Sequence, residues 1–177
     1  RETPEASLLL AQVLRKEGKF TEAKDVIEEF LRKDVLSSLK EEASRMLIDL
    51  NIDSNDLVNA KEISDSLRSL NPTSILNLVY ASRISKLLGK SDDAVSLLKE
   101  AEKNITDCST FIEILAVATE FYSLEQFEDA AKNYEKIVNK SLNTPLNREL
   151  LNSYYRGGEL DKALYVCQAL RMKYGPL

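Results

Sequence analysis

The sequence contains no histidine. Histidine is the side chain that most often acts as a general base near neutral pH, activates serine and cysteine nucleophiles, and binds catalytic zinc. Its absence excludes histidine-based catalysis and most catalytic zinc sites. The sequence also lacks a phosphate-binding loop, a GxSxG nucleophile elbow and a cluster of metal ligands. We therefore expect no catalytic residue, no metal and no cofactor in this chain.

Cysteines and long apolar runs are also scarce. The two cysteines, Cys108 and Cys167, lie far apart and form no CxxC pair, which excludes a zinc knuckle and a dithiol redox motif. We expect both to be small buried hydrophobic residues. The longest stretch without a charge, Ser69 to Ser82, is shorter than the roughly 20 apolar residues of a membrane span, so no span is predicted.

Residues that interrupt helices are few. The chain of 177 residues has only 5 glycines and 4 prolines, while 44% of its residues are hydrophobic and 30% are charged. This composition supplies enough apolar material for a packed core and favours helices over a loop-rich or collagen-like chain. The net charge of −5 makes the chain mildly acidic.

A short motif recurs along the chain: glycine, a polar residue, a variable residue, two polar residues and alanine. It begins at Gly18, Gly89 and Gly158, and degenerate copies begin at Asn55 and Glu125. Successive motif alanines are separated by 37, 34, 36 and 33 residues, so the chain has a repeat period near 34. These alanines are Ala23, Ala60, Ala94, Ala130 and Ala163.

Apolar residues recur at helical spacing on both sides of each motif. Large residues lie four and seven positions after the first alanine, at Ile27 and Phe30, and a second stripe precedes the first turn, at Leu10 and Leu14. Apolar residues follow Ala94, Ala130 and Ala163 at the same spacing, and a second stripe precedes each of the other turns. Each repeat is therefore predicted to be two amphipathic helices joined by a tight turn.

Capping signals support this division. Ser38-x-x-Glu41 and Thr110-x-x-Glu113 read as capping boxes that open the first helices of the second and fourth repeats. Asn71-Pro72 is expected to end the second repeat, because proline cannot continue a helix.

On these residues the sequence resembles the tetratricopeptide repeat (TPR) family, whose unit is a helix-turn-helix of about 34 residues. The resemblance implies an all-α fold, a right-handed α-α superhelix, or solenoid, of about five such repeats. The sequence departs from the family pattern: the first consensus aromatic is absent, Ser91 replaces a large residue, and Asn51 and Ser64 stand where apolar residues are expected. We expect a single repeat domain over residues 1–177, a segment of a longer protein, with repeats at approximately 4–37, 38–73, 74–108, 109–143 and 144–177.

The resemblance also implies a function, because stacked repeats of this family bind partners in a concave groove lined by the first helix of each pair. Tyrosine and arginine are enriched at interface hot spots, and several lie on the first helices off the apolar stripes. We therefore predict a non-catalytic scaffold that binds a peptide or partner protein. The candidate groove residues are Arg45, Asp49, Tyr80, Arg83, Lys86, Tyr122, Arg148, Asn152, Tyr155 and Arg156.

One sharper function is disfavoured by the residues. Family members that grip the C-terminal carboxylate of chaperone tails use Lys, Asn and Arg from three repeats, and only Arg148 and Asn152 fit part of that pattern.

Other functions stay open as alternatives. RNA binding by repeats needs a positive field, which the net charge of −5 opposes, although Arg45, Arg83, Arg148 and Arg156 would form a local basic groove. A catalytic domain outside this segment is a second alternative. The apolar last helix, Leu160 to Tyr174, has no polar capping helix after it, so self-association through this helix is a further hypothesis.

Overall fold

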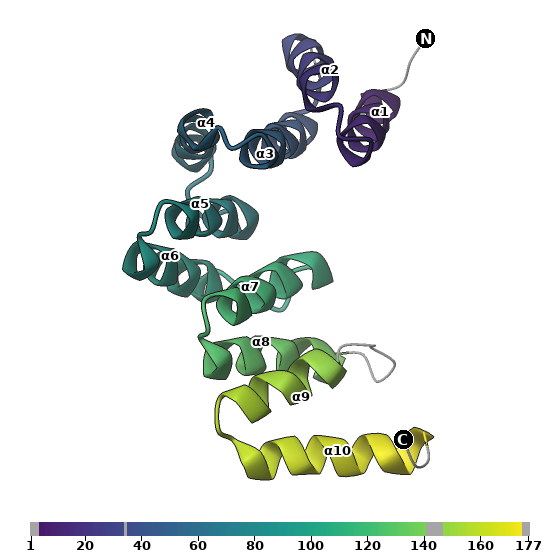
Figure 1. Ribbon diagram of the computed structural model, residues 1–177, viewed down its shortest axis with the longest axis vertical. Helices are drawn as coiled ribbons and strands as arrows, with labels where there is room; N and C mark the ends of the chain where they lie inside the picture. Colours follow the sequence, from purple (N-terminus) through teal and green to yellow (C-terminus); the bar gives the residue numbers. More distant parts are fainter. Residues whose placement is uncertain (1–3, 34, 141–146, 175–177) are drawn as a thin grey trace.

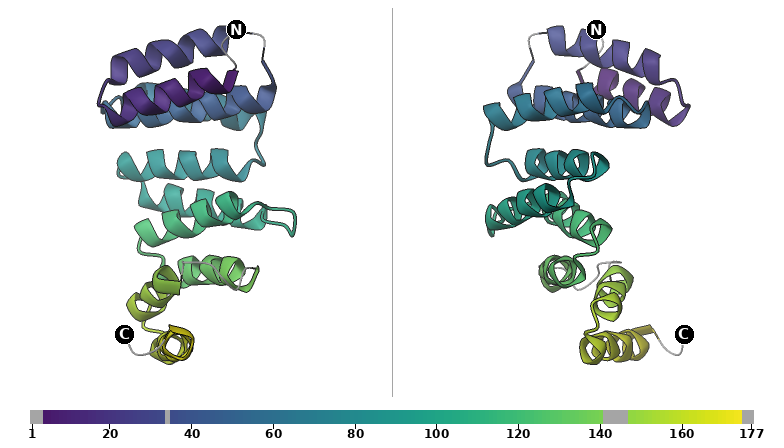
Figure 2. Two further views of the ribbon diagram at one scale, coloured as in Figure 1. Left: turned by 90° about the vertical axis from the view of Figure 1, so that its right-hand side faces the viewer. Right: turned by 60° about the vertical axis from the view of Figure 1, so that its left-hand side comes forward.

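A computed structural model describes residues 4–33, 35–140 and 147–174. These residues form ten α-helices and no strand. The helices stack along one long axis, with the first helical pair at one end and the last helix at the other (Figures 1 and 2). They are α1 (Pro4–Lys16), α2 (Phe20–Arg32), α3 (Ser37–Asp53), α4 (Leu57–Leu70), α5 (Ile75–Leu87), α6 (Ser91–Lys103), α7 (Phe111–Ser123), α8 (Phe127–Lys140), α9 (Asn147–Arg156) and α10 (Leu160–Tyr174).

The helices pack as five consecutive hairpins, α1/α2 through α9/α10, and each hairpin contacts the next. The predicted solenoid of five helical hairpins is therefore confirmed. The expected boundary between the fourth and fifth repeats, at residues 143 and 144, lies outside the described residues.

The turn within each hairpin uses a left-handed backbone residue. Gly18, Gly89 and Gly158 have φ of 76°, 75° and 78°, and Asn55 and Glu125 have φ of 59° at the equivalent positions. Glycine adopts this region without a steric cost, whereas a residue with a Cβ does not. The degenerate motif copies thus keep the turn geometry without the glycine.

The motif alanines are buried within the hairpins. Four of them are fully buried, and Ala163 is 6% exposed. Two helices approach each other closely only where a small side chain faces the partner helix, which explains why alanine recurs at these positions.

The buried apolar residues form three clusters. The N-terminal cluster joins α1, α2 and α3 around Ile27 and Phe30. The C-terminal cluster runs from α5 to α10 around Leu98 and Phe121. Between them lies a small middle cluster, which consists of Ile48, Ala60, Leu67 and Ile84 with their neighbours on α3, α4 and α5.

Polar residues are buried beside the middle cluster. Asn51, Ser64 and Asn77 are each less than 5% exposed. The Asn77 amide donates to the Leu67 carbonyl at 3.3 Å. The contact between the second hairpin (α3/α4) and the third (α5/α6), here called the second junction, is therefore partly polar. The third junction, between α5/α6 and α7/α8, belongs to the large C-terminal cluster.

Three local predictions are wrong. Helix α3 begins at Ser37 with Leu36 as its N-cap and no capping hydrogen bond, so Ser38 lies inside the helix and does not open a capping box. Leu10 is exposed, because α1 turns Leu8 and Ala11 towards the core and the run of three leucines hides this register. Cys108 is exposed in the loop after α6, and Cys167 is half-buried; both are free thiols.

Two other local predictions are confirmed. Thr110 and Glu113 form a complete capping box at the start of α7. Helix α4 ends at Leu70, directly before Asn71-Pro72.

Candidate functional site

The first helices of the N-terminal hairpins enclose a groove. A hollow of about 730 Å³ lies between α1 and α3, and Tyr80 of α5 also lines it. Ala11, Met46 and Leu50 give it an apolar lining, and charged side chains of both signs surround that lining. We call this hollow the first-helix groove.

Asp49 is the centre of a polar network on this face. Its carboxylate accepts from Arg15 Nη1 at 3.0 Å and from the Tyr80 hydroxyl at 3.1 Å, and it lies 3.5 Å from Arg83 Nη1. Arg15 also pairs with Asp53, Nε to Oδ2 at 2.5 Å. One carboxylate therefore links α1, α3 and α5, three helices that come from three different hairpins.

The surroundings of Tyr80 favour the protonated form of its hydroxyl. Burial, together with the negative charge of Asp49, raises the pKa of Tyr80 to about 12. The Arg83 guanidinium lies 5.1 Å from the Tyr80 ring centroid, in cation–π contact. The hydroxyl therefore donates to Asp49 at neutral pH and fixes the position of the ring beside the groove.

The network continues from α5 to α7. Arg83 Nε donates to Glu120 Oε2 at 3.3 Å, and Glu120 is only 5% exposed. The Ser123 hydroxyl donates to the other carboxylate oxygen at 3.1 Å, and Lys86 Nζ donates to the Ser123 carbonyl at 2.7 Å. Buried carboxylates are stable only when paired and hydrogen-bonded, and these contacts supply both.

Arg45 joins the second and third hairpins beside this network. Its Nη1 donates to the Asn77 side-chain oxygen at 3.0 Å and lies 3.5 Å from Glu41. Five of the predicted groove residues thus lie on α3 and α5. These five are Arg45, Asp49, Tyr80, Arg83 and Lys86. Asp49 contacts Tyr80 and Arg83, while Arg45 and Lys86 bond to residues that were not predicted.

The remaining predicted residues lie on α7 and α9. Tyr122, Arg148 and Asn152 line a second hollow of about 350 Å³, together with Tyr134 and Glu149. Burial raises the pKa of Tyr134, so this hollow also presents a neutral hydroxyl.

Arg156 and Tyr155 lie at the C-terminal end of α9. The Arg156 guanidinium lies 5.6 Å from the Tyr122 ring and 5.8 Å from the Phe127 ring. The two rings pack edge to face at 5.4 Å. Tyr155 is 68% exposed and lines neither hollow.

Sequence reasoning missed Arg15 and Glu120, although both belong to the network. Arg15 lies three residues before Gly18, the position that Lys86 and Tyr155 occupy before Gly89 and Gly158. Alignment of the first helices by their turn residues would have found it. Glu120 is the one charged residue of α7 beyond its first turn, and this is the sequence signal of a buried acid.

Within residues 4–33, 35–140 and 147–174, no three His, Cys, Asp or Glu side chains are grouped so that they could hold a metal ion. No helix in this part of the chain is long and apolar enough to cross a membrane.

Comparisons of sequence find no relative: no family model matches the chain, and no curated protein matches it. Comparison of structures does find similar proteins. The TPR-like repeats of a putative kinesin light chain from Podosopora anserina match with a TM-score of 0.63 and 17% identity, over 97% of this chain and 96% of that chain. The chain has the tetratricopeptide-repeat fold.

Two further structures place this TPR fold in proteins of different kinds. BtubC from P. vanneervenii matches with a TM-score of 0.67 and 18% identity, over 98% of this chain and 82% of that chain. A chain in the structure of Naa15/Naa10 bound to HypK-THB matches with a TM-score of 0.63 and 10% identity, over 98% of this chain and 26% of that chain. At these identities the likeness describes the TPR fold and no specific ligand.

Proposed function

We propose that this chain is a non-catalytic scaffold that binds a peptide or partner protein in the first-helix groove. The observation that supports this proposal is the groove itself, in which an apolar lining is surrounded by fixed charges and by Tyr80. Apolar area contributes affinity, while charges in fixed positions contribute orientation and selectivity. The structural neighbours include a partner-bound complex, that of Naa15/Naa10 with HypK-THB.

The network around Asp49 prepares the groove for binding. Arg15, Tyr80 and Arg83 are already held in place by hydrogen bonds and ion pairs before a ligand arrives. Binding therefore costs less side-chain entropy than it would with free side chains.

RNA binding finds less support, because the arginines that would form a basic groove are engaged. Arg45 and Arg83 pair with Glu41, Asp49 and Glu120. Arg148 lies 3.3 Å from Glu149, and Arg156 packs on aromatic rings. These four side chains form no free positive stripe that would release counterions from a phosphate backbone.

The test changes the groove and leaves the network intact. Lys16 and Glu42 line the groove, are exposed, and have no hydrogen bond or ion pair in the described part of the chain. The double variant Lys16→Glu/Glu42→Lys keeps the net charge and reverses the pattern that a ligand meets. We expect it to lose the proteins that the unchanged chain captures from its native cells, as measured by quantitative mass spectrometry and then with the purified partner.

A matched charge exchange away from the groove serves as the control. Glu62 of α4 and Lys103 of α6 are exposed and line no hollow described here, so Glu62→Lys/Lys103→Glu is expected to keep every partner. If the groove variant melts at the unchanged temperature and keeps its partners as well, the first-helix groove is not the binding site.

A further inference from the structure

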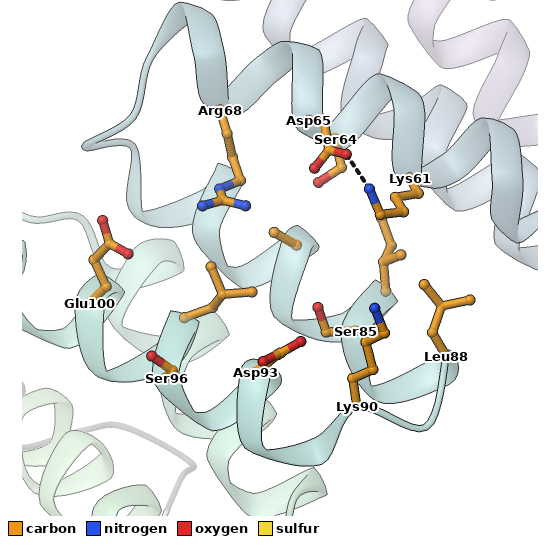
Figure 3. A pocket seen from close by; sticks show the side chains of 13 residues that line it. Lys61, Ser64, Asp65, Arg68, Ser85, Leu88, Lys90, Asp93, Ser96 and Glu100 are labelled. Carbon is orange, nitrogen blue, oxygen red and sulfur yellow. Dashed lines mark hydrogen bonds and ion pairs between the residues drawn. The ribbon is translucent and has the colours of Figure 1, made fainter.

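A separate cleft lies among the second helices, at the second junction. It has a volume of about 390 Å³, with walls from α4 and α6 and a floor from α5 (Figure 3). None of its lining residues also lines the first-helix groove. The cleft is thus an independent site, and it does not rest on the function proposed above.

The equivalent helices at the third junction are joined by ion pairs. Lys99 Nζ of α6 lies 2.5 Å from Asp129 Oδ1 of α8. Glu102 of α6 accepts from the Asn133 amide at 2.9 Å and lies 3.8 Å from Lys136 Nζ. These contacts hold the second helices of the third and fourth hairpins together.

Alignment of the hairpins by their alanines shows why α4 and α6 are not joined in this way. The positions of Lys99 and Asp129 are taken by Asp65 and Asp93, two acids in place of an ion pair. Both line the cleft. Asp65 instead binds Lys61 on its own helix, and this pair is visible in Figure 3.

Ser64 leaves both space and an unpaired hydroxyl in the wall of the cleft. The position four residues after the motif alanine holds Ile27, Leu98 and Tyr134 in the first, third and fourth hairpins, and these side chains fill the core. Ser64 at this position is 2% exposed, and its hydroxyl has no hydrogen-bond partner. A buried hydroxyl without a partner carries a desolvation cost that the apolar side chains at the equivalent positions do not.

Charged groups in the cleft also lack partners. Arg68 is half-buried and points into the cleft from α4, while Asp93 and Glu100 face it from α6 (Figure 3). Within the described residues, the side chains of these three residues and of Lys90 form no ion pair or hydrogen bond. The cleft therefore presents both free donors and free acceptors.

We propose that this cleft binds an extended peptide segment that carries a basic side chain a few residues from an acidic one. The basic side chain pairs with Asp93. This ion pair is equivalent to the one that Lys99 forms with Asp129 between α6 and α8. The acidic side chain pairs with Arg68. The volume lies within the range of ligand pockets, and mixed charges select against peptides of one sign.

The experiment selects ligands on the intact chain and removes the cleft in a variant. A random-peptide phage library is panned on the unchanged chain and counter-selected on the variant Ser64→Leu/Asp65→Lys. This variant carries the residue types that the third hairpin has at the same positions, Leu98 and Lys99. We expect enriched peptides that hold Lys or Arg within a few residues of Asp or Glu. Their affinity should fall by about tenfold or more on the counter-selection variant, as measured by fluorescence anisotropy.

Two surface variants test the named contacts without relying on the filled cleft. Arg68→Ala and Asp93→Asn should each weaken the selected peptides by about tenfold, the expected loss of a charge-assisted hydrogen bond. The groove variant Lys16→Glu/Glu42→Lys should bind them unchanged. The proposal is overturned if no peptide distinguishes the two panned proteins, if the selected peptides lack paired charges, or if their binding depends on the first-helix groove.

Discussion

The second and third junctions are built from the same repeat yet are held together differently. At the third junction, Leu98 and Phe121 belong to a large apolar cluster, and ion pairs join α6 to α8. At the second junction the apolar cluster is small, amides and hydroxyls are buried, and α4 and α6 are separated by an open cleft. The polar network around Asp49 holds the first helices together there.

This difference shows that the stability of a repeat protein can be low at one junction and high at the next. The stability of a solenoid is approximately a sum of repeat and neighbour terms, so each junction contributes separately. The second junction is held on one side by charges and hydrogen bonds, whereas the third is held on both sides. Changes at the two junctions should therefore have unequal effects.

The largest expected effect is in the apolar cluster. Leu98→Ala should lower the free energy of unfolding by about 2–5 kcal/mol, because it removes a fully buried side chain and leaves a cavity. Ser64→Ala, at the equivalent position of the second hairpin, should not lower it, because it removes a buried hydroxyl that has no hydrogen-bond partner. Urea denaturation of both variants measures the difference, and equal losses would contradict the unequal junctions.

The next effect concerns the network. Asp49→Asn should cost about 1–3 kcal/mol, since Arg15, Tyr80 and Arg83 all lose a charged acceptor. Hydrogen exchange should become faster in α4 and α5 and stay unchanged in α8. Asp53→Asn is the control, because Asp53 pairs with Arg15 alone among the described residues, and it should cost about 0.5 kcal/mol. Uniform loss of protection along the chain would show that the network does not act at the second junction.

A smaller effect tests whether the turn of the second hairpin, instead of the second junction, lowers stability in this region. Asn55→Gly should raise the free energy of unfolding by no more than about 0.5 kcal/mol, because asparagine tolerates the left-handed region. Glu125→Gly should raise it by about 1 kcal/mol, because glutamate does not. Thermal denaturation with matched buffers measures both. If Asn55→Gly raised the free energy of unfolding by several kcal/mol, the turn and not the second junction would be the cause of the low stability.

The last effect is seen only at high pH. The pKa of Tyr80 is about 12 in the folded chain and about 10 when unfolded, so folding favours the protonated hydroxyl. Its contribution to stability is fully present below pH of about 10 and is lost as the pH rises through about 12. The ultraviolet titration difference between the unchanged chain and Tyr80→Phe should show this late ionisation. A difference that titrates near the ordinary tyrosine value would contradict the buried contact with Asp49.

The sequence predicted the hairpins well, because their signals are local. The motif alanines are buried within the hairpins, and the turn positions were found even where Asn55 and Glu125 replace glycine. Thr110 and Glu113 also signalled their capping box correctly.

The site was predicted less completely, because its contacts join different hairpins. Tyr80 and Asp49 were chosen one by one, while their partner Arg15 lies 34 residues before Asp49 and was not chosen. The cleft can be recognised only by comparing hairpins. Asp65 and Asp93 occupy the positions of Lys99 and Asp129, and this alignment shows that the ion pair is missing. Leu10 failed for another reason, since three consecutive leucines fit more than one helical register.

The middle cluster also determines how the chain responds to force. A pull on the two ends of a solenoid acts on every junction in series, so the most compliant junction extends first. We expect that junction to be the second one, because Ile48, Ala60, Leu67 and Ile84 with few neighbours form its apolar cluster. Under tension, the hairpins on either side of the second junction should therefore move as two stiff units about that junction. A partner that contacts both units would fix the angle between them.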